Sequence, residues 1–205
     1  ASTTATLNTG SAAFVGIESG DTVTIGVGSA SGTFADKNIG TGKTVQVSGV
    51  TKSGGDAGNY TITQPTTTAN ITAKTLTVTG VTSTNRVYDA TISATGLLSY
   101  GPAALQGTET GDTVTLDTTQ IAAVFLNKNV GTGKSVVVSG LTIGGTDSGN
   151  YSLTQPTTTA NITAKTLTVS GITAANKTYN ASTTATLNTG SAAFVGIESG
   201  DTVTI

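Results

Sequence analysis

The side chains of this chain that could do chemistry are few. Among its 205 residues there is no cysteine, histidine, methionine or tryptophan. This absence removes thiol nucleophiles, imidazole bases and the usual zinc and haem ligands. Carboxylates, lysines and tyrosines recur along the chain, and each repeated group is a candidate site.

A glycine-lysine motif resembles the end of a phosphate-binding loop. It reads Gly-Thr-Gly-Lys-Thr at residues 40–44 and Gly-Thr-Gly-Lys-Ser at residues 131–135. A phosphate-binding loop also needs a glycine five residues before its Gly-Lys pair, where this chain has Lys37 and Lys128, and it needs a strand-to-helix transition. The motif therefore predicts a glycine hairpin turn and no cofactor-binding site.

Repeated carboxylates are the next candidates, as calcium ligands: Asp21, Asp36, Asp56, Asp112 and Asp147. No Asp-x-Asp-x-Asp loop occurs, and the position of Asp36 holds Asn127 in the next copy, so a turn-capping role is favoured over a metal site. Glutamates also recur, and a pair of acids could hydrolyse a glycoside: Glu18, Glu109 and Glu198. An active site copied into every repeat is uncommon, so we expect no catalytic residue.

Lysine and asparagine raise a third possibility, an intramolecular amide bond formed beside an acid. The repeated residues that could form it are Lys37/Lys128, Asn38/Asn129, Asn59/Asn150 and Asp21/Asp112. Surface lysines and turn asparagines are the favoured alternative. Intact mass decides between them, because each such bond would remove one ammonia.

Asparagines and tyrosines offer two further surface roles. Six asparagines satisfy the N-glycosylation pattern, a match that arises easily in so threonine-rich a chain: Asn59, Asn70, Asn150, Asn161, Asn176 and Asn180. Four tyrosines could form a row that binds sugars: Tyr60, Tyr88, Tyr151 and Tyr179. We expect instead that each tyrosine anchors a strand in the core, with its hydroxyl bonded to a nearby loop.

The overall composition limits the class of protein. Hydrophobic residues make up 36%, charged residues 10%, and the net charge is −2, with twenty-seven glycines. These values exclude a charged disordered tail, and no apolar run approaches the ~18 to 20 residues of a membrane helix. Membrane insertion is therefore not expected. The lysines form no basic stripe, so nucleic acid is not expected as a partner.

The chain is built from repeats. Residues 1–25 return unchanged as 181–205, and residues 63–78 return as 154–169, an offset of 91. Boundaries at the lysine of the Ile-Thr-Ala-Lys run give a truncated first module at 1–74, a complete second module at 75–165 and the N-terminal part of a third at 166–205. A truncated module should expose unpaired strand edges, so we expect head-to-tail contact with a neighbouring copy.

Hydrophobic periodicity predicts β-strands throughout. Apolar residues alternate with threonine in residues 22–25, 44–47, 60–62, 74–81 and 113–116. Glycine, asparagine and aspartate clusters break the chain every eight to twelve residues, as turns do. The fold class predicted is all-β: tandem antiparallel β-sandwich (Ig-like) modules of about 90 residues, each with six to eight strands.

The join between modules carries no flexible linker. Residues 69–78 contain no glycine or proline, and an extended pattern runs from one module into the next. We therefore expect a stiff junction, with any bend confined to residues 72–75, and modules arranged as a rod.

Four segments carry ordered motifs: residues 82–91, 173–183, 33–47 and 58–74 hold Lys/Arg-x-Tyr-Asp/Asn, Lys-Asn-x-Gly-Thr-Gly-Lys and Gly-Asn-Tyr in that module order. Together they resemble the YDG repeat, and the related MBG repeats, of large bacterial surface and filamentous-haemagglutinin-like adhesins. The family has glycine where this chain has Ala90 and Ala181. The resemblance implies a secreted, cell-surface module that serves as stalk or fibre in adhesion or biofilm, without catalytic residues.

Three classes of function follow. The first is a structural stalk or fibre repeat whose partners are its neighbouring modules. The second is a glycan- or matrix-binding module that acts by weak multivalent contacts, or a subunit of a self-assembling extracellular filament. An enzyme is the third and least expected.

Overall fold

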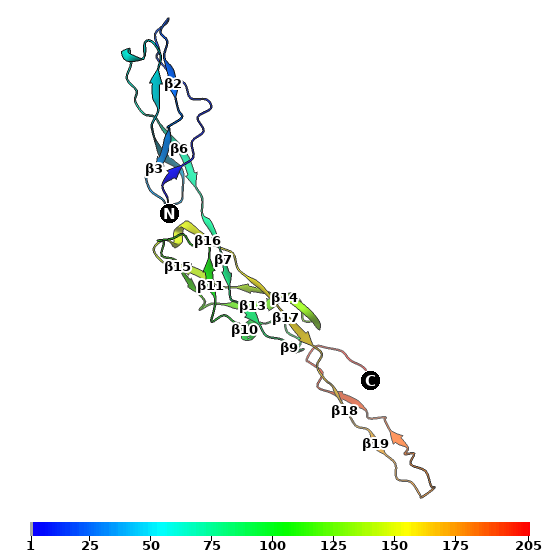
Figure 1. Ribbon diagram of the computed structural model, residues 1–205. Helices are drawn as coiled ribbons and strands as arrows, with labels where there is room; N and C mark the ends of the chain where they lie inside the picture. Colours follow the sequence, from blue (N-terminus) through cyan, green and yellow to red (C-terminus); the bar gives the residue numbers. More distant parts are fainter. Residues whose placement is uncertain (1) are drawn as a thin grey trace. The chain divides into compact units, whose positions relative to one another are not determined.

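The computed structural model describes residues 2–205, and they form an all-β protein (Figure 1). The described residues contain no α-helix, and their helical segments are short 3-10 turns: η1 (Ala57–Asn59), η2 (Thr95–Leu97) and η3 (Ser148–Asn150). No helix within residues 2–205 is long and apolar enough to cross a membrane. The all-β prediction is thereby confirmed.

The chain divides into two compact units, and neither follows the repeat boundaries. Unit 1 joins Ala1–Leu76 to Leu105–Leu116 and Ile143–Thr154, while unit 2 contains Thr77–Ala104, Asp117–Thr142 and Gln155–Ile205. One end of the second repeat therefore folds with the first repeat, so contacts between repeats occur inside a unit.

Unit 1 is organised around a four-stranded antiparallel sheet. Its strand order is β1 (Thr4–Ala5), β3 (Ser31–Phe34), β4 (Gly40–Ser48) and β6 (Thr66–Ile71). A second antiparallel pair joins β2 (Thr24–Gly26) to β5 (Thr51–Ser53). In β4, Val45 and Val47 alternate with polar residues, which suits a pleated surface with one face packed.

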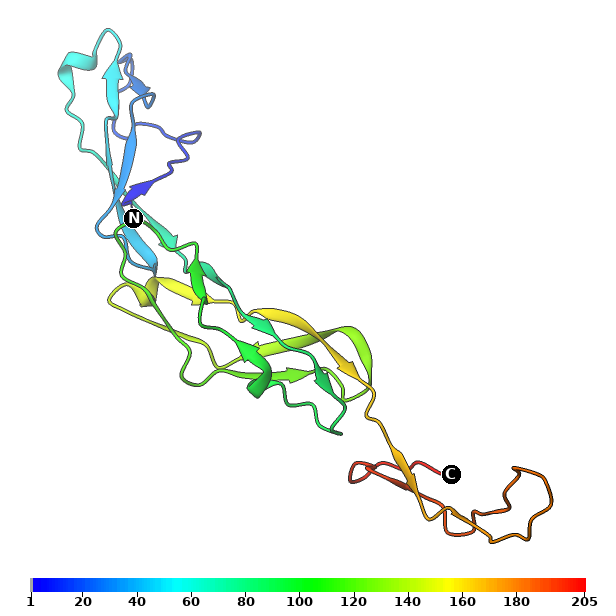
Figure 2. The ribbon, with the colours of Figure 1, turned by 60° about the horizontal axis from the view of Figure 1, so that its bottom comes forward.

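Unit 2 contains a second four-stranded sheet, in which the counterpart of β1 is reduced to a single bridge between Ser93 and Val124. The order is β13 (Ala122–Phe125), β14 (Gly131–Ser139), β17 (Thr157–Thr163) and β9 (Arg86–Val87). Two-residue strands β8 (Thr82–Ser83) and β10 (Leu98–Ser99) pair beside it. The third repeat, drawn in orange to red in Figure 2, contributes two hairpin ladders: β18 (Thr168–Ser170) pairs with β21 (Ala193–Val195), and β19 (Thr173–Ala174) pairs with β20 (Leu187–Asn188).

Two further sheets complete the second repeat. One has the order β11 (Ala104–Gln106), β7 (Lys74–Thr79) and β16 (Tyr151–Leu153), and the other pairs β12 (Thr115–Asp117) with β15 (Thr142–Gly144). The pairings of β16 with β7 and of β17 with β9 are parallel. The expectation of purely antiparallel pairing is wrong at these two places, where strands distant in sequence meet.

The best-packed core belongs to the second repeat. The side chains of Phe125, Val136, Val138 and Ile162 are each at most 1% exposed. Val136 and Val138 follow the period of two along β14, and Phe125 and Ile162 come from the strands on either side. The cross-strand neighbours thus bury one face of this sheet.

The predicted strands agree with the structure to different degrees. Residues 44–47 lie inside β4, 74–81 contain β7, and 22–25 and 113–116 overlap β2 and β12. The strand predicted at residues 60–62 is wrong, because these residues form no strand, although their counterpart β16 does. The predicted number of six to eight strands is also wrong for the second repeat. Its strands β7 to β17 number eleven, because bulges and turns break them.

Glycine is required at one recurring turn. Gly140 follows β14 with a φ of 78°, and a Cβ atom there would lie 1.9 Å from the carbonyl oxygen of Gln120. No other residue type fits without moving the backbone. The Ig-like topology and the rod arrangement stay predictions.

Candidate functional site

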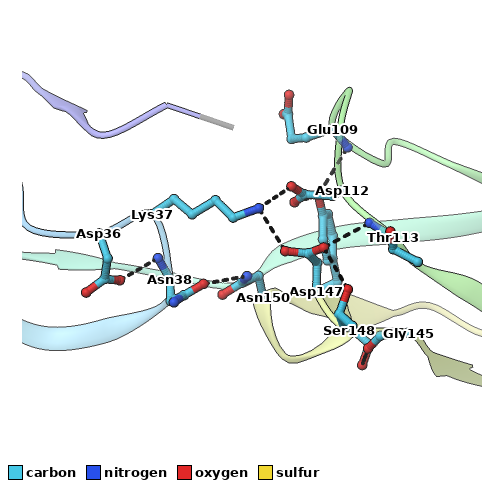
Figure 3. Close-up of polar contacts among 12 residues, drawn as sticks. Asp36, Lys37, Asn38, Glu109, Asp112, Thr113, Gly145, Asp147, Ser148 and Asn150 are labelled. Carbon is cyan, nitrogen blue, oxygen red and sulfur yellow. Dashed lines mark hydrogen bonds and ion pairs between the residues drawn. The ribbon is translucent and has the colours of Figure 1, made fainter.

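The most developed polar cluster lies where the first repeat meets the second, inside unit 1. Lys37 belongs to the turn that follows β3, and its side chain reaches two aspartates of the second repeat (Figure 3). Its Nζ donates to Asp112 Oδ1 at 2.5 Å and to Asp147 Oδ1 at 2.7 Å. We call these three residues the junction cluster.

The exposure of the junction cluster is uneven. The side chain of Asp112 is 4% exposed, that of Asp147 17% and that of Lys37 34%. The hydrogen bonds that Lys37 donates are the main cause that lowers the pKa of both aspartates. The same bonds raise the pKa of Lys37, and the bond to Asp112 has the larger effect. All three groups are therefore charged at neutral pH.

Neighbouring groups hold the aspartates in place. Tyr151, which is buried, donates its hydroxyl hydrogen to Asp112 Oδ2 at 2.7 Å, and its oxygen accepts the backbone N–H of Glu109 at 3.1 Å. Asp147 Oδ2 accepts the backbone N–H of Thr113 at 2.9 Å. The two carboxylates are thus positioned by hydrogen bonds within their own repeat, independently of the lysine from the other repeat.

Asparagines tie the same two repeats together. Asn150 Nδ2 donates to Asn38 Oδ1 at 3.1 Å, and Asn150 Oδ1 accepts the backbone N–H of Ile39 at 3.0 Å (Figure 3). Lys74, at the start of β7, forms an ion pair with Glu109. The junction therefore combines backbone, amide and ionic contacts.

The same arrangement recurs in unit 2, between the second repeat and the third. Lys128, the counterpart of Lys37, donates to Asp201 Oδ1 at 2.6 Å, and Asp201 is the counterpart of Asp112. Lys165 pairs with Glu198, as Lys74 pairs with Glu109. The chain therefore builds one type of junction twice.

A tyrosine of the preceding repeat joins this second junction. Tyr88 donates its hydroxyl hydrogen to Asp201 Oδ2 at 2.6 Å, and Lys128 Nζ lies 5.7 Å from the centre of its ring. Bonds from Lys128 and then Tyr88 lower the pKa of Asp201. Asp201 therefore receives hydrogen bonds from two side chains of the second repeat.

The structure changes the amide-bond hypothesis. Lys37 and Lys128 reach aspartates, and the side chains of Asn38 and Asn150 bond to each other. Amide formation needs an uncharged amine, and an ion pair with carboxylates holds both lysines charged. The lysine-to-asparagine bond is therefore not supported by the geometry.

The glycine-lysine motif is part of a strand. Residues 40–43 lie in β4, where the register shifts between Gly40 and Lys43 and Gly42 has a φ of 59°. The hairpin-turn prediction is wrong here, since the motif forms a β-bulge. Asn70 Oδ1 accepts the N–H of Gly42 at 2.8 Å, so this asparagine of a glycosylation pattern holds the bulge in place.

The other candidate residues act in turns and at loop ends. Asp36 accepts the backbone N–H of Asn38 two residues on, as a turn-capping residue does. Asp56 and Asp147 make no cap bond in their own turns and accept N–H groups 34 residues away, from Thr22 and Thr113, so the turn-capping prediction is wrong for these two. The described residues contain no group of three acids placed to hold a metal ion. Glu18 and Glu109 donate their backbone N–H to Tyr60 and Tyr151, and no acid pair for glycoside hydrolysis is brought together by these contacts.

The predicted hydroxyl bond is present in three of the four tyrosines, but only Tyr151 is buried in a strand, because Tyr60 and Tyr88 lie outside the strands and are half-buried. Tyr60 donates to Asp21 Oδ2 at 2.7 Å, as Tyr151 does to Asp112, and Tyr88 bonds Asp201. Tyr179 is 90% exposed, so the core-anchor prediction is wrong there.

The arginine of the Arg-x-Tyr-Asp motif has a role that sequence analysis missed. Arg86 Nη1 donates to Asp89 Oδ2 at 3.0 Å and to the Ser93 carbonyl at 2.7 Å, and its guanidinium lies 4.9 Å from the Phe125 ring centre. Its Nη2 also bonds the Thr91 carbonyl. The arginine of the motif thus holds the following turn in place by hydrogen bonds. The fixed order of cation, tyrosine and acid in the sequence was the feature that could have predicted this role.

Comparison with known proteins supports the repeat assignment. The model of the YDG domain matches residues 1–69, 72–160 and 163–205. No curated protein matches the chain, and no solved structure matches it. The matched segments cover nearly all of the sequence in three successive copies, and the chain therefore belongs to the YDG domain family.

Proposed function

We propose that this chain is a structural stalk or fibre repeat of a bacterial cell-surface or extracellular adhesin, and that it is not an enzyme. The observation that carries the proposal is the recurrence of the Lys-Asp contact at both junctions, Lys37 to Asp112 and Lys128 to Asp201. A repeat that serves only as a tether needs no such specific contact. A repeat that must hold its orientation along an array does.

The junction contacts support a mechanical role. Lys37 forms ion pairs with Asp112 and Asp147. A second ionic contact joins Lys74 to Glu109. Single exposed ion pairs contribute little to stability, but several contacts in one place restrict the angle between neighbours. The polar cluster therefore serves orientation, while the apolar core of each repeat provides stability.

Glycan or matrix binding is less well supported. The hydroxyls of Tyr60, Tyr88 and Tyr151 are bonded to aspartates, so these tyrosines do not form a free row for stacking on sugars. Each junction holds a crevice of about 280 Å³, which is near the lower limit of ligand pockets.

The stalk role is tested by measuring the junction directly. Because the chain has no cysteine, one cysteine in each of the first two repeats places a fluorophore pair without background labelling. We expect a narrow distance distribution that broadens in Lys37→Ala. Lys43→Ala is the control, since Lys43 pairs with Asp36 in its own repeat and its loss should leave the width unchanged.

A flexible junction in the unaltered chain would contradict the proposal. Specific retention of the purified chain on a glycan or matrix array would favour the binding role instead. Turnover of a substrate that is lost in Glu109→Gln would favour an enzyme.

A further inference from the structure

The strands that open the second repeat pair with the strands that close it. The repeat opens with β7 and β9, and it closes with β16 and β17. β7 pairs with β16 in unit 1, and β9 pairs with β17 in unit 2 (Figure 1). Both pairs are parallel, whereas the pairs that β14 forms with β13 and β17 are antiparallel. The two parallel pairs therefore join the beginning of the repeat to its end.

The pair of β7 with β16 is shielded from water. Tyr151 lies opposite Lys74, and Leu153 lies opposite Leu76. The N–H of Thr154 donates to the carbonyl of Leu76 at 2.9 Å. The side chain of Leu76 is fully buried, and that of Tyr151 is also buried. Backbone hydrogen bonds beside such side chains are strengthened, because little water competes for them.

The pair of β9 with β17 is extended on both sides by further bonds. Thr163 lies opposite Val87, and its carbonyl accepts the N–H of Tyr88 at 2.9 Å. One residue before β9, the Oδ1 atom of Asn85 accepts the N–H of Asn161 at 2.7 Å. The opening segment thus holds β17 through both backbone and side-chain bonds.

A pull along the chain would load these parallel pairs in shear. The chain before Lys74 pulls β7 from its N-terminal end, and the chain after Leu153 pulls β16 from its C-terminal end. Because the two strands are parallel, these ends lie at opposite ends of the ladder, and the strands are drawn past one another. All bonds of the ladder then share the load. In an antiparallel pair the two loaded ends would lie together, and the bonds would break one after another.

The strands that supply much of the core lie outside the path of such a pull. β13 and β14 come between β9 and β16 in the sequence, and they contribute Phe125, Val136 and Val138 to the buried core. A pull that is transferred from β7 to β16 and from β9 to β17 bypasses them. The core therefore stays unloaded until the parallel pairs separate.

We propose that the second repeat bears tension, with β7 paired to β16 and β9 paired to β17 acting as a mechanical clamp against a pull along the chain. The proposal rests on the stalk role and goes beyond it, because a stalk needs a fixed orientation whether or not it carries tension. Resistance to force depends on the rate of unfolding and not on equilibrium stability alone. Shear loading of a shielded ladder slows that rate.

Single-molecule force measurements on the full chain test the clamp. The chain has no cysteine, so the pair Thr72→Cys and Ala164→Cys places handles only at the two ends of the second repeat. Both positions are exposed. We expect one rupture that releases about 90 residues, or roughly 300 Å of extended chain at ~3.3 Å per residue.

A second pair of handles loads the same ladder in the other direction. Thr72→Cys with Gly149→Cys puts both handles at the N-terminal ends of β7 and β16, so the ladder is peeled from one end. A Cβ atom at Gly149 meets open space, so this substitution should leave the fold intact. We expect a rupture force several-fold lower than in shear. The bond of Asn150 to Asn38 adds resistance in this geometry and therefore works against the expected difference.

A pair of matched variants tests where the load is carried. Asn85→Ala removes one bond between the opening segment and β17, and the repeat should then rupture about fivefold faster at constant shear force, as expected for one hydrogen bond. Asn127→Ala is the control, since it removes the bond to the N–H of Asn129 in the turn between β13 and β14. Both asparagines are exposed, and circular dichroism checks that both variants fold. The control should rupture at the rate of the unaltered chain.

Equal rupture forces in the two pulling directions would overturn the clamp. Equal acceleration by Asn85→Ala and Asn127→Ala would also overturn it, because the load would then not be concentrated on the parallel pairs. The stalk role is tested separately, since the fluorophore distances across the junction are measured without force. A narrow distance distribution together with low resistance in shear would reject the clamp alone, whereas a broad distribution would contradict the stalk role at any rupture force.

Discussion

At the residue scale, the clearest departure from the family is at its third signature position. Ala90 and Ala181 stand where the family has glycine, and they adopt φ values of 61° and 57°. This left-handed conformation is easy for glycine and costs other residues free energy, because Cβ approaches the carbonyl oxygen. The family glycine is therefore explained by the turn that Arg86 braces.

We predict that Ala90→Gly stabilises the second repeat. The relief of the left-handed strain outweighs the extra entropy that glycine gives the unfolded chain, so the free energy of unfolding should rise by about 0.5–1 kcal/mol. Urea denaturation followed by circular dichroism measures it. Ala94→Gly is the control, since Ala94 is buried without this φ and should lose stability.

Arg86 should be the most sensitive charged residue of its turn. Arg86→Met keeps apolar length but leaves the carbonyls of Thr91 and Ser93 without their donor, so we expect a loss of about 2 kcal/mol or more. Lys177→Met, at the exposed counterpart, should cost less. Equal losses in the two variants, measured by the same denaturation, would contradict the brace.

At the element scale, the three-strand arrangement around β14 holds the second repeat together. Phe125 on β13 and Val136 on β14 are opposite one another, and both are at most 1% exposed. In the first repeat the equivalent pair is Phe34 and Val45, and Phe34 is only half-buried. The same element is therefore better packed where β9 covers its neighbour.

Truncation of the two phenylalanines should show this difference. Phe125→Ala should lower the free energy of unfolding by about 3–5 kcal/mol, the usual cost of removing a fully buried ring. Phe34→Ala should cost clearly less, because solvent already reaches that ring. Denaturant titration of both variants checks the order, and a larger loss for Phe34→Ala would contradict the packing described.

At the scale of the whole molecule, the contacts between the first two repeats include groups that titrate at the two extremes of pH. The pKa of Asp112 is lowered from 3.8 by Lys37 and then Tyr151, and that of Asp147 by Lys37. A lowered folded-state pKa gives stabilisation that is full above the unfolded value and is lost as pH falls through the folded value. The raised pKa of Lys37 gives stabilisation that is full below about pH 10.4, the pKa of an unfolded lysine, and that is lost as the pH rises through the higher folded-state value.

We therefore predict an acid opening of the junction. Fluorophore pairs across the first junction should keep a narrow distance distribution from about pH 5 to 9 and broaden below about pH 4. The broadening should occur before the apolar core unfolds, as followed by circular dichroism. Lys37→Ala should already be broad at neutral pH and respond little to acid, and an acid response equal to that of the unaltered chain would contradict this assignment.

The sequence by itself determined the local features of this protein. Alternating threonine and valine predicts strands because side chains on a strand point to opposite faces, and the repeated Lys, Tyr and Asp positions identify the YDG domain. The lack of cysteine and histidine limits the chemistry without any coordinates. The turn-capping role of Asp36 was also predictable, since it bonds the backbone two residues along the chain.

Only the tertiary structure decided which repeats share a contact and which strands are complete. Lys37 and Asp147 are far apart in sequence, so no local pattern could pair them, and β6 and β17 have one sequence but different exposure. Residues 60–62 and β16 differ for the same reason, because a strand needs a partner and its own residues do not supply one. Partners are supplied by the fold around a segment, and in this chain they differ between copies of the same repeat.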